Sequence, residues 1–364
     1  MLLTPDDIKK TLSRVQDPDL KKDLVSLGMI QSIHVEEKKV SFKVVLTTPA
    51  CPLKEVIKNN CLEALEEDHG KDWEWDIFMT SQVTTVREAT PILPQVKNII
   101  AIASGKGGVG KSTTSVNLAV ALAKSGAKVG LIDADISGPS IPTMFNVEGE
   151  QPAVKKVGEK NTIVPITQYG VKLMSIGFLT PAESAVVWRG PMASSALRQF
   201  ISDVEWGELD YLLIDLPPGT SDIHLTMVQT VPVTGAVIVT TPQKIALADA
   251  TKGLTMFMQP QINVPVLGVI ENMAYFTPEE LPENKYYLFG KDGGKKLAQK
   301  YQVPFLGEIP IVQSIRESGD TGYPAVLKVG PTQNAYMELA ESVARQIAIR
   351  NASSEKTTVV EVKA

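Results

Sequence analysis

The sequence predicts an α/β protein in which a small α+β domain precedes a doubly wound, mostly parallel sheet. Beyond residue 98, apolar runs typical of buried parallel strands alternate with helical patterns. This alternation predicts right-handed crossovers and a ligand site at the carboxyl ends of the strands. The predicted strands lie at 99–103, 128–133, 211–215, 235–240 and 266–270. Before them, alternating apolar residues at 40–46 predict a half-buried strand between two amphipathic helices.

Length, charge and hydropathy limit the classes of function that this chain can have. The chain has 364 residues, a net charge of −5 and 43% hydrophobic residues, which suits two domains with sizeable cores. The acidic balance argues against a nucleic-acid partner. The first residues lack the pattern of a signal peptide, and no apolar run approaches the ~20 residues that span a bilayer. We therefore expect a cytoplasmic protein with no membrane partner.

Proline and polarity suggest the domain boundaries. We expect an α+β domain at 1–87, a proline-containing linker at 88–97, an α/β domain at 98–350 and a disordered polar tail at 351–364. The last helical pattern, before residue 350, mixes acids and bases on its polar face. A membrane-binding helix needs a basic polar face, so this helix is expected to pack in the domain.

A glycine-rich segment between the first predicted strand and a helical pattern has the spacing G-x-x-x-x-G-K-S of a phosphate-binding P-loop. Glycines let successive N–H groups point at one anion, and the following helix adds a positive dipole end. Lys111 is expected to reach the outer phosphates, and the Ser112 hydroxyl to ligate Mg²⁺. The alternative is a turn that contains lysine by chance. The expected Mg-ATP-binding residues are Gly105, Lys106, Gly107, Gly108, Val109, Gly110, Lys111, Ser112 and Thr113.

Acidic residues follow two of the predicted strands. Asp133 and Asp135 come at the end of one strand, and Asp215 ends another. A carboxylate at such a position can hold Mg²⁺ or orient an attacking water. Each aspartate alone is weak evidence for a metal site, because many α/β proteins have an aspartate at a strand end by chance. Three beside a P-loop predict a magnesium site, with Ser112, Asp133 and Asp215 as its residues.

The loop also carries a second lysine, Lys106, where the plain motif leaves the position open. The form G-K-G-G-V-G-K-S resembles the deviant Walker A loop of the superfamily that contains MinD, ParA and the nitrogenase iron protein. This resemblance implies a homodimer that faces itself across two nucleotides, with Lys106 reaching the partner's phosphates. It also implies that Lys106, Lys111 and Asp135 are catalytic, Asp135 as the water-activating residue, and that Asp215 is the Walker B acid. The alternative for Lys106 is an exposed loop charge.

Residues 206–222 resemble the corresponding segment of the Mrp/ApbC ATPases, which are iron–sulfur cluster carriers, and 133–140 and 188–192 are similar to the same family. The resemblance covers nearly the whole chain. It implies slow ATP hydrolysis, and apo iron–sulfur proteins or assembly proteins as partners. It also implies that Asn272 contacts the adenine base; the alternative for Asn272 is a turn residue at a strand end.

The first domain resembles the small PaaD-like domain of metal–sulfur cluster assembly proteins, through 17–19, 27–30 and 47–52. The resemblance implies that Cys51 is a functional thiol and a possible metal ligand. A helix predicted to begin at Pro52 would favour the thiolate of Cys51. The alternative is a small apolar capping residue. Cys61 lies on the apolar stripe of that helix and is expected to be buried.

The sequence departs from the Mrp/ApbC pattern in one place. The family carries C-x-x-C shortly after the segment that corresponds to 271–273, and residues 275–287 contain no cysteine. Iron–sulfur clusters are held mainly by four thiolates. Three functions therefore stay open: an ATPase that carries clusters or assists iron–sulfur assembly, a metal-free nucleotide-switched dimeric adaptor, and a partitioning ATPase on membrane or DNA.

Overall fold

The computed structural model describes residues 3–88, 90–158, 160–179, 190–278, 280–281 and 283–360. The chain divides into two compact units. The first comprises Met1–Thr84 and Ala348–Ser354, and the second comprises Thr85–Ile347 and Glu355–Ala364.

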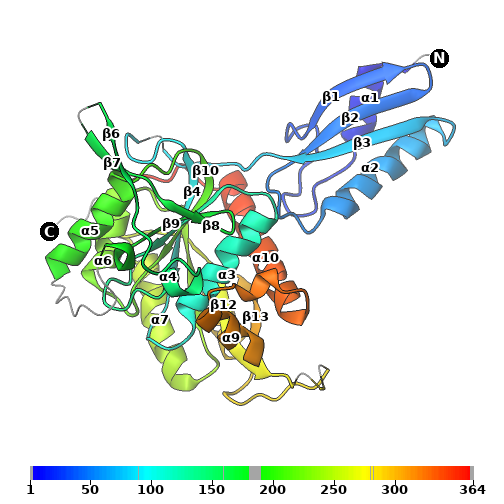
Figure 1. The fold of residues 1–364 in the computed structure, drawn as a ribbon. Helices are drawn as coiled ribbons and strands as arrows, with labels where there is room; N and C mark the ends of the chain where they lie inside the picture. The colour runs from blue at the N-terminus through cyan, green and yellow to red at the C-terminus, as the bar shows by residue number, and fades with distance from the viewer. Residues whose placement is uncertain are drawn as a thin grey trace. The chain divides into compact units, whose positions relative to one another are not determined.

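The first unit is the predicted α+β arrangement, with a three-stranded sheet in the order β1-β2-β3 (Figure 1). β1 and β2 are antiparallel, whereas β2 and β3 are parallel because α2 connects them. Its elements are α1 (Pro5–Leu12), β1 (Ile30–Glu36), β2 (Lys39–Leu46), α2 (Lys54–His69) and β3 (Glu74–Ser81).

Local sequence explains why these elements form. The Thr4 side chain caps α1 by accepting from the Asp7 backbone N–H, and the Asp7 carboxylate accepts from the Thr4 backbone N–H, which completes a capping box. Along β2, alternate residues from Val40 to Leu46 are buried, as the period-two pattern predicts. They pack with Ile8 of α1 and Leu65 of α2 in one hydrophobic core.

The second unit is built on an eight-stranded sheet in the order β13-β12-β11-β4-β10-β5-β9-β8. All neighbouring strands are parallel except β8 and β9. The strands are β4 (Val96–Ala103), β5 (Val129–Asp133), β8 (Ile166–Gln168), β9 (Val171–Ser175), β10 (Leu209–Asp215), β11 (Gly235–Thr240), β12 (Val266–Phe276) and β13 (Phe305–Ile311). A separate hairpin pairs β6 (Val154–Val157) with β7 (Lys160–Ile163).

Helices cover both faces of this sheet, as Figure 1 shows. Ile99 and Ala101 of β4 belong to one core with Phe200 of α5 and Phe257 of α7, whereas α3 packs on the other face. The helices are α3 (Lys111–Lys124), α4 (Ile141–Met144), α5 (Gly190–Ser202), α6 (Asp222–Thr230), α7 (Lys244–Met258), α8 (Gly293–Tyr301), α9 (Gln313–Thr321) and α10 (Pro331–Ser353), with 3₁₀ turns η1 (Ile176–Phe178) and η2 (Ala325–Leu327).

The doubly wound architecture and all five predicted strands are confirmed. Three details differ from the expectations. α2 begins at Lys54 rather than Pro52, and β12 runs on past Asn272 to Phe276. In the predicted disordered tail, α10 continues to Ser353 and Thr357 pairs with Arg87.

Among the described helices, none is both long and apolar enough to cross a bilayer.

Candidate functional site

The predicted phosphate loop connects the end of β4 at Ala103 to the start of α3 at Lys111. Its last glycine, Gly110, caps α3 in the left-handed region with φ 77°, which an L side chain rarely adopts. The N-terminus of α3 therefore lies beside a loop whose backbone is shaped for an anion. This is the strand–loop–helix context that the sequence motif requires.

The first glycine of the loop has a different role. A Cβ atom on Gly105 would lie 2.0 Å from the backbone carbon of Asp249 in α7. Gly105 thus lets α7 pack directly against the loop. This contact connects the loop to the segment after β11.

The side chain of Asp215, at the end of β10, is the centre of the site. It is fully buried, and its Oδ2 accepts hydrogen bonds from Lys111 Nζ at 2.8 Å and Ser112 Oγ at 2.6 Å. Its Oδ1 accepts from Ser115 Oγ at 2.6 Å. Lys111 is itself buried, so the ion pair lies almost out of water. The structure therefore brings Lys111, Ser112 and Asp215 together.

Ser115 is the contact that sequence reasoning misses. The only signal is its position four residues after Lys111, which places it on the same side of a helix. Polar residues on buried helix faces have many other uses, so this spacing alone does not identify a partner.

Asp133 lies in the strand next to Asp215, where β5 pairs with β10 residue for residue. Its Oδ2 accepts from Ser175 Oγ at 3.0 Å and from the Ile141 amide at 3.4 Å. Burial raises the pKa of Asp133 to about 7, and the nearby charge of Asp215 adds to the rise. A cation at this site would favour the ionised form.

Asp135 lies just beyond the strand end and is only partly buried. Its backbone N–H donates to Asp133 Oδ1 at 3.2 Å. Burial raises the pKa of Asp135, while the positive charge of Lys111 opposes that rise. Its carboxylate is thus the most accessible of the three acids.

These residues fit a magnesium–nucleotide complex. Carboxylate and hydroxyl oxygens are the ligands that Mg²⁺ prefers, and Mg²⁺ usually takes only one or two carboxylates together with substrate phosphates. Within the described residues, no cluster of three or more His, Cys, Asp or Glu could hold a metal ion by itself. Ser112 and Asp215, with Asp133 behind them, would therefore hold the ion together with bound phosphates.

Asn272 approaches the loop from β12. Its Nδ2 donates to the Val109 carbonyl at 2.8 Å, and a Cβ on Gly110 would lie 2.1 Å from this Nδ2. The backbone bends directly after it, because Met273 has φ 54°. In this structure Asn272 thus supports the phosphate loop, and its contact with adenine stays a prediction.

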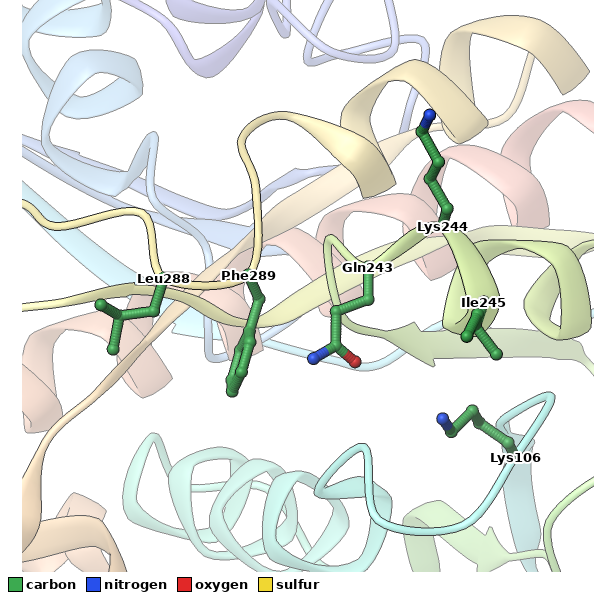
Figure 2. Close-up of a pocket in the computed structure, with 6 residues that line it drawn as sticks. All are labelled: Lys106, Gln243, Lys244, Ile245, Leu288 and Phe289. Carbon is green, nitrogen blue, oxygen red and sulfur yellow. The ribbon is translucent and has the colours of Figure 1, made fainter.

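The other loop lysine, Lys106, lines a pocket of about 500 Å³ (Figure 2). The pocket is open and is otherwise formed by the start of α7 and by the segment before α8, through Gln243, Lys244, Ile245, Leu288 and Phe289. The Lys106 side chain is partly exposed, so both its dimer role and its alternative remain predictions.

The two cysteines belong to the first unit, one before α2 and one within it. Cys51 is partly exposed, three residues before α2 begins, and Cys61 is fully buried as predicted. Burial raises the pKa of the Cys61 thiol to about 12, so it stays protonated at neutral pH. The later start of α2 means that Cys51 does not occupy the first turn of the helix.

The segment that lacks the family cysteines has regular contacts of its own. Phe276 and Tyr286 form an antiparallel bridge, and Lys285 Nζ lies 4.1 Å from the centroid of the Tyr275 ring. Glu279 and Pro282 of this segment lie outside the described residues, as do Trp188 and Arg189 of the 188–192 match.

Fold and site together define a P-loop NTPase. The chain belongs to the ParA family described as NUBPL iron-transfer P-loop NTPase, which matches residues 95–347. Residues 5–72 match a second family, described as iron-sulfur cluster assembly protein. The resemblance inferred from the motifs is thereby confirmed.

Named relatives agree with this assignment. The chain is 47% identical over 350 residues to an iron-sulfur cluster carrier protein of Synechocystis, covering 95% of this chain and 98% of the relative. It is 46% identical over 352 residues to the protein of that name in Deinococcus radiodurans, covering 96% and 97%. A solved nucleotide-binding protein from Archaeoglobus fulgidus, in complex with ADP, is 41% identical with a TM-score of 0.57, covering 66% of this chain and 95% of that one.

Proposed function

We propose that this protein is a slow, magnesium-dependent ATPase that works as a homodimer in the assembly of iron–sulfur proteins. The observation that carries this proposal is the convergence of Lys111 and Ser112 on Asp215 beside the phosphate loop. The names of its relatives supply the cargo class.

Each residue has a role that follows from its position. Loop amides and Lys111 hold the phosphates, and Lys111 offsets the charge that develops on them. Asp135, the accessible acid, orients the attacking water. Magnesium, when bound, supplies a charge that stabilises the β- and γ-phosphate oxygens. Asn272 fixes the loop through Val109 and contacts the adenine base of the bound nucleotide.

The proposal of a homodimer depends on the position of Lys106. Among the described residues, no hydrogen bond or ion pair joins this lysine to the three aspartates, and it lines an open pocket instead. A partner subunit would bring its phosphates to that side of the loop.

Hydrolysis is tested by substitution of three lysines. Lys111→Ala should abolish phosphate release, and Lys106→Ala should reduce both hydrolysis and nucleotide-dependent dimerisation. Lys124→Ala is the control, because Lys124 is exposed at the opposite end of α3. Full activity in Lys111→Ala or Lys106→Ala contradicts the assigned roles.

The cargo is tested by anaerobic reconstitution. The chain has two cysteines, and buried Cys61 is unsuited to ligation, so a dimer offers one Cys51 thiolate from each subunit. A cluster held by this protein would need further ligands from an acceptor or a small thiol. The test supplies iron, sulfide and glutathione to the protein, and measures the visible spectrum and the transfer of a cluster to an apo iron–sulfur protein. Transfer that is lost in Cys51→Ala supports carriage, whereas absence of both cluster absorbance and transfer rejects it.

A second candidate is favoured by the missing cysteines at 275–287. In this case the protein is a metal-free dimeric adaptor that docks assembly proteins when ATP is bound. Partner capture should then depend on Lys111 and be unaffected in Cys51→Ala. Capture that is unchanged in Lys111→Ala excludes this function.

A further inference from the structure

The carboxylate of Asp215 has donors of two kinds. Oδ2 accepts from Lys111 and Ser112, which are the two residues that the proposed function assigns to phosphate and magnesium. Oδ1 accepts from Ser115, which lies one helical turn further into α3. Asp215 is fully buried, so bulk water cannot replace a donor that leaves.

Binding of a nucleotide draws on these donors unequally. Lys111 carries three N–H donors and Ser112 can bind a metal through its oxygen, so both can serve the ligand while their contacts with Oδ2 change in geometry. Ser115 has no exposed surface, and its single hydroxyl proton lies within reach of two acceptors, Asp215 Oδ1 at 2.6 Å and the Lys111 carbonyl at 3.0 Å. The contact with the charged carboxylate is the shorter and stronger of the two. Ser115 is assigned to neither phosphate nor metal, so it is the donor that need not turn when a ligand binds.

We propose that Ser115 is a positioning residue that holds Oδ1 of Asp215, so that Oδ2 faces the magnesium site. A hydroxyl donor on a charged carboxylate makes a short and strong hydrogen bond. Without it, the carboxylate can rotate about its last bond, and its geometry toward a metal is lost. This inference rests on the proposed function, because it assumes that magnesium binds with the nucleotide.

The test is a magnesium titration of fluorescent methylanthraniloyl-ADP binding to the full chain. In Ser115→Ala, the Mg²⁺ concentration for half-maximal binding should rise about tenfold or more, as is typical for groups that orient a metal ligand. Affinity for the probe in EDTA should change less than about twofold, because the Ser115 hydroxyl contacts only the Asp215 carboxylate and the Lys111 backbone carbonyl, and no N–H group that is assigned to phosphate.

Thr114→Val is the matched control. Thr114 is equally buried on the same helix, and its hydroxyl donates to the Gly110 carbonyl at 2.9 Å rather than to Asp215. The control should titrate as wild type does. Equal magnesium dependence in Ser115→Ala and wild type, or an equal loss in Thr114→Val, overturns the proposal.

A folding measurement and a second variant accompany the magnesium titration. Thermal unfolding by circular dichroism shows whether Ser115→Ala folds; if it does not, Ser115→Cys keeps the volume and supplies only a weak donor. Ser115→Cys should then show the raised magnesium requirement, and a wild-type titration by this variant overturns the proposal. Wild type that binds the probe without any magnesium dependence refutes the magnesium part of the proposed function, and the role of Ser115 with it.

Discussion

The buried ion pair between Lys111 and Asp215 predicts a large and asymmetric effect on stability. Lys111→Met removes the cation while Asp215 stays fully buried, with only hydroxyl donors left. Loss of one partner of a buried pair costs about 3–5 kcal/mol. We expect the lower end, about 3 kcal/mol, because Ser112 and Ser115 still solvate the carboxylate.

The asymmetry follows from side-chain length. In Asp215→Asn, the long Lys111 side chain can turn toward the phosphate-binding side and recover water, so this variant should lose less. Lys111→Met combined with Asp215→Asn should regain more than half of the loss, since no buried charge remains.

The assay is hydrogen–deuterium exchange of β4 and β10 peptides in the nucleotide-free protein, which reports this sheet separately from the first unit. About 3 kcal/mol corresponds to exchange more than ~100-fold faster. Lys124→Met, at the exposed end of α3, is the control. Exchange in Lys111→Met within threefold of wild type, or a double variant no better than Lys111→Met, would refute this account of the pair.

Three more predictions concern other parts of the molecule. Gly110→Ala should weaken binding of ADP at least tenfold, because its φ of 77° strains an L residue and its Cβ would displace the Asn272 amide. Gly319→Ala in α9, where an added Cβ meets nothing within 4 Å, should leave binding unchanged, and isothermal titration compares the two variants. The raised pKa of Asp133, about 7, means that the folded state holds a proton between pH 4 and 7 that the unfolded state releases, so nucleotide-free stability should fall over that range and level off above it. Asp133→Asn should flatten this fall in urea unfolding, and an unchanged slope contradicts it. Iodoacetamide should label Cys51 in the native protein and label Cys61 only in urea, as mass spectrometry can show, because the Cys61 thiol is buried.

The sequence predicts the phosphate loop and the strand-end acids because both signals are local. The loop is one contiguous motif, and each aspartate directly follows an apolar run. Parallel strands in a doubly wound sheet then bring Asp133 and Asp215 to the same edge without further information.

Features that depend on residues far away in the chain are harder to predict from the sequence. Ser115 and its carboxylate partner are 100 residues apart, and nothing near Ser115 marks the contact. Asn272 is expected at a strand end, yet β12 continues because it pairs with β13, whose sequence lies more than 30 residues further on. α2 begins at Lys54, and its cap residue, Leu53, makes no side-chain capping bond, so no local capping signal marks this start in the sequence.

The nucleotide site and the segment at 275–287 are held by different contacts, and this bears on the missing cysteines. The segment is fastened by its own Phe276–Tyr286 bridge, and the helix that follows it is anchored by Glu271, which accepts a hydrogen bond from the Gly294 amide. The hydrogen bonds on Asp215 come from α3 instead. Cysteines could therefore be absent from this segment without changing the phosphate-binding residues. It follows that ATP hydrolysis and cargo binding should respond to separate substitutions, and a Cys51→Ala protein with normal ATPase activity but no cluster transfer would show that separation directly.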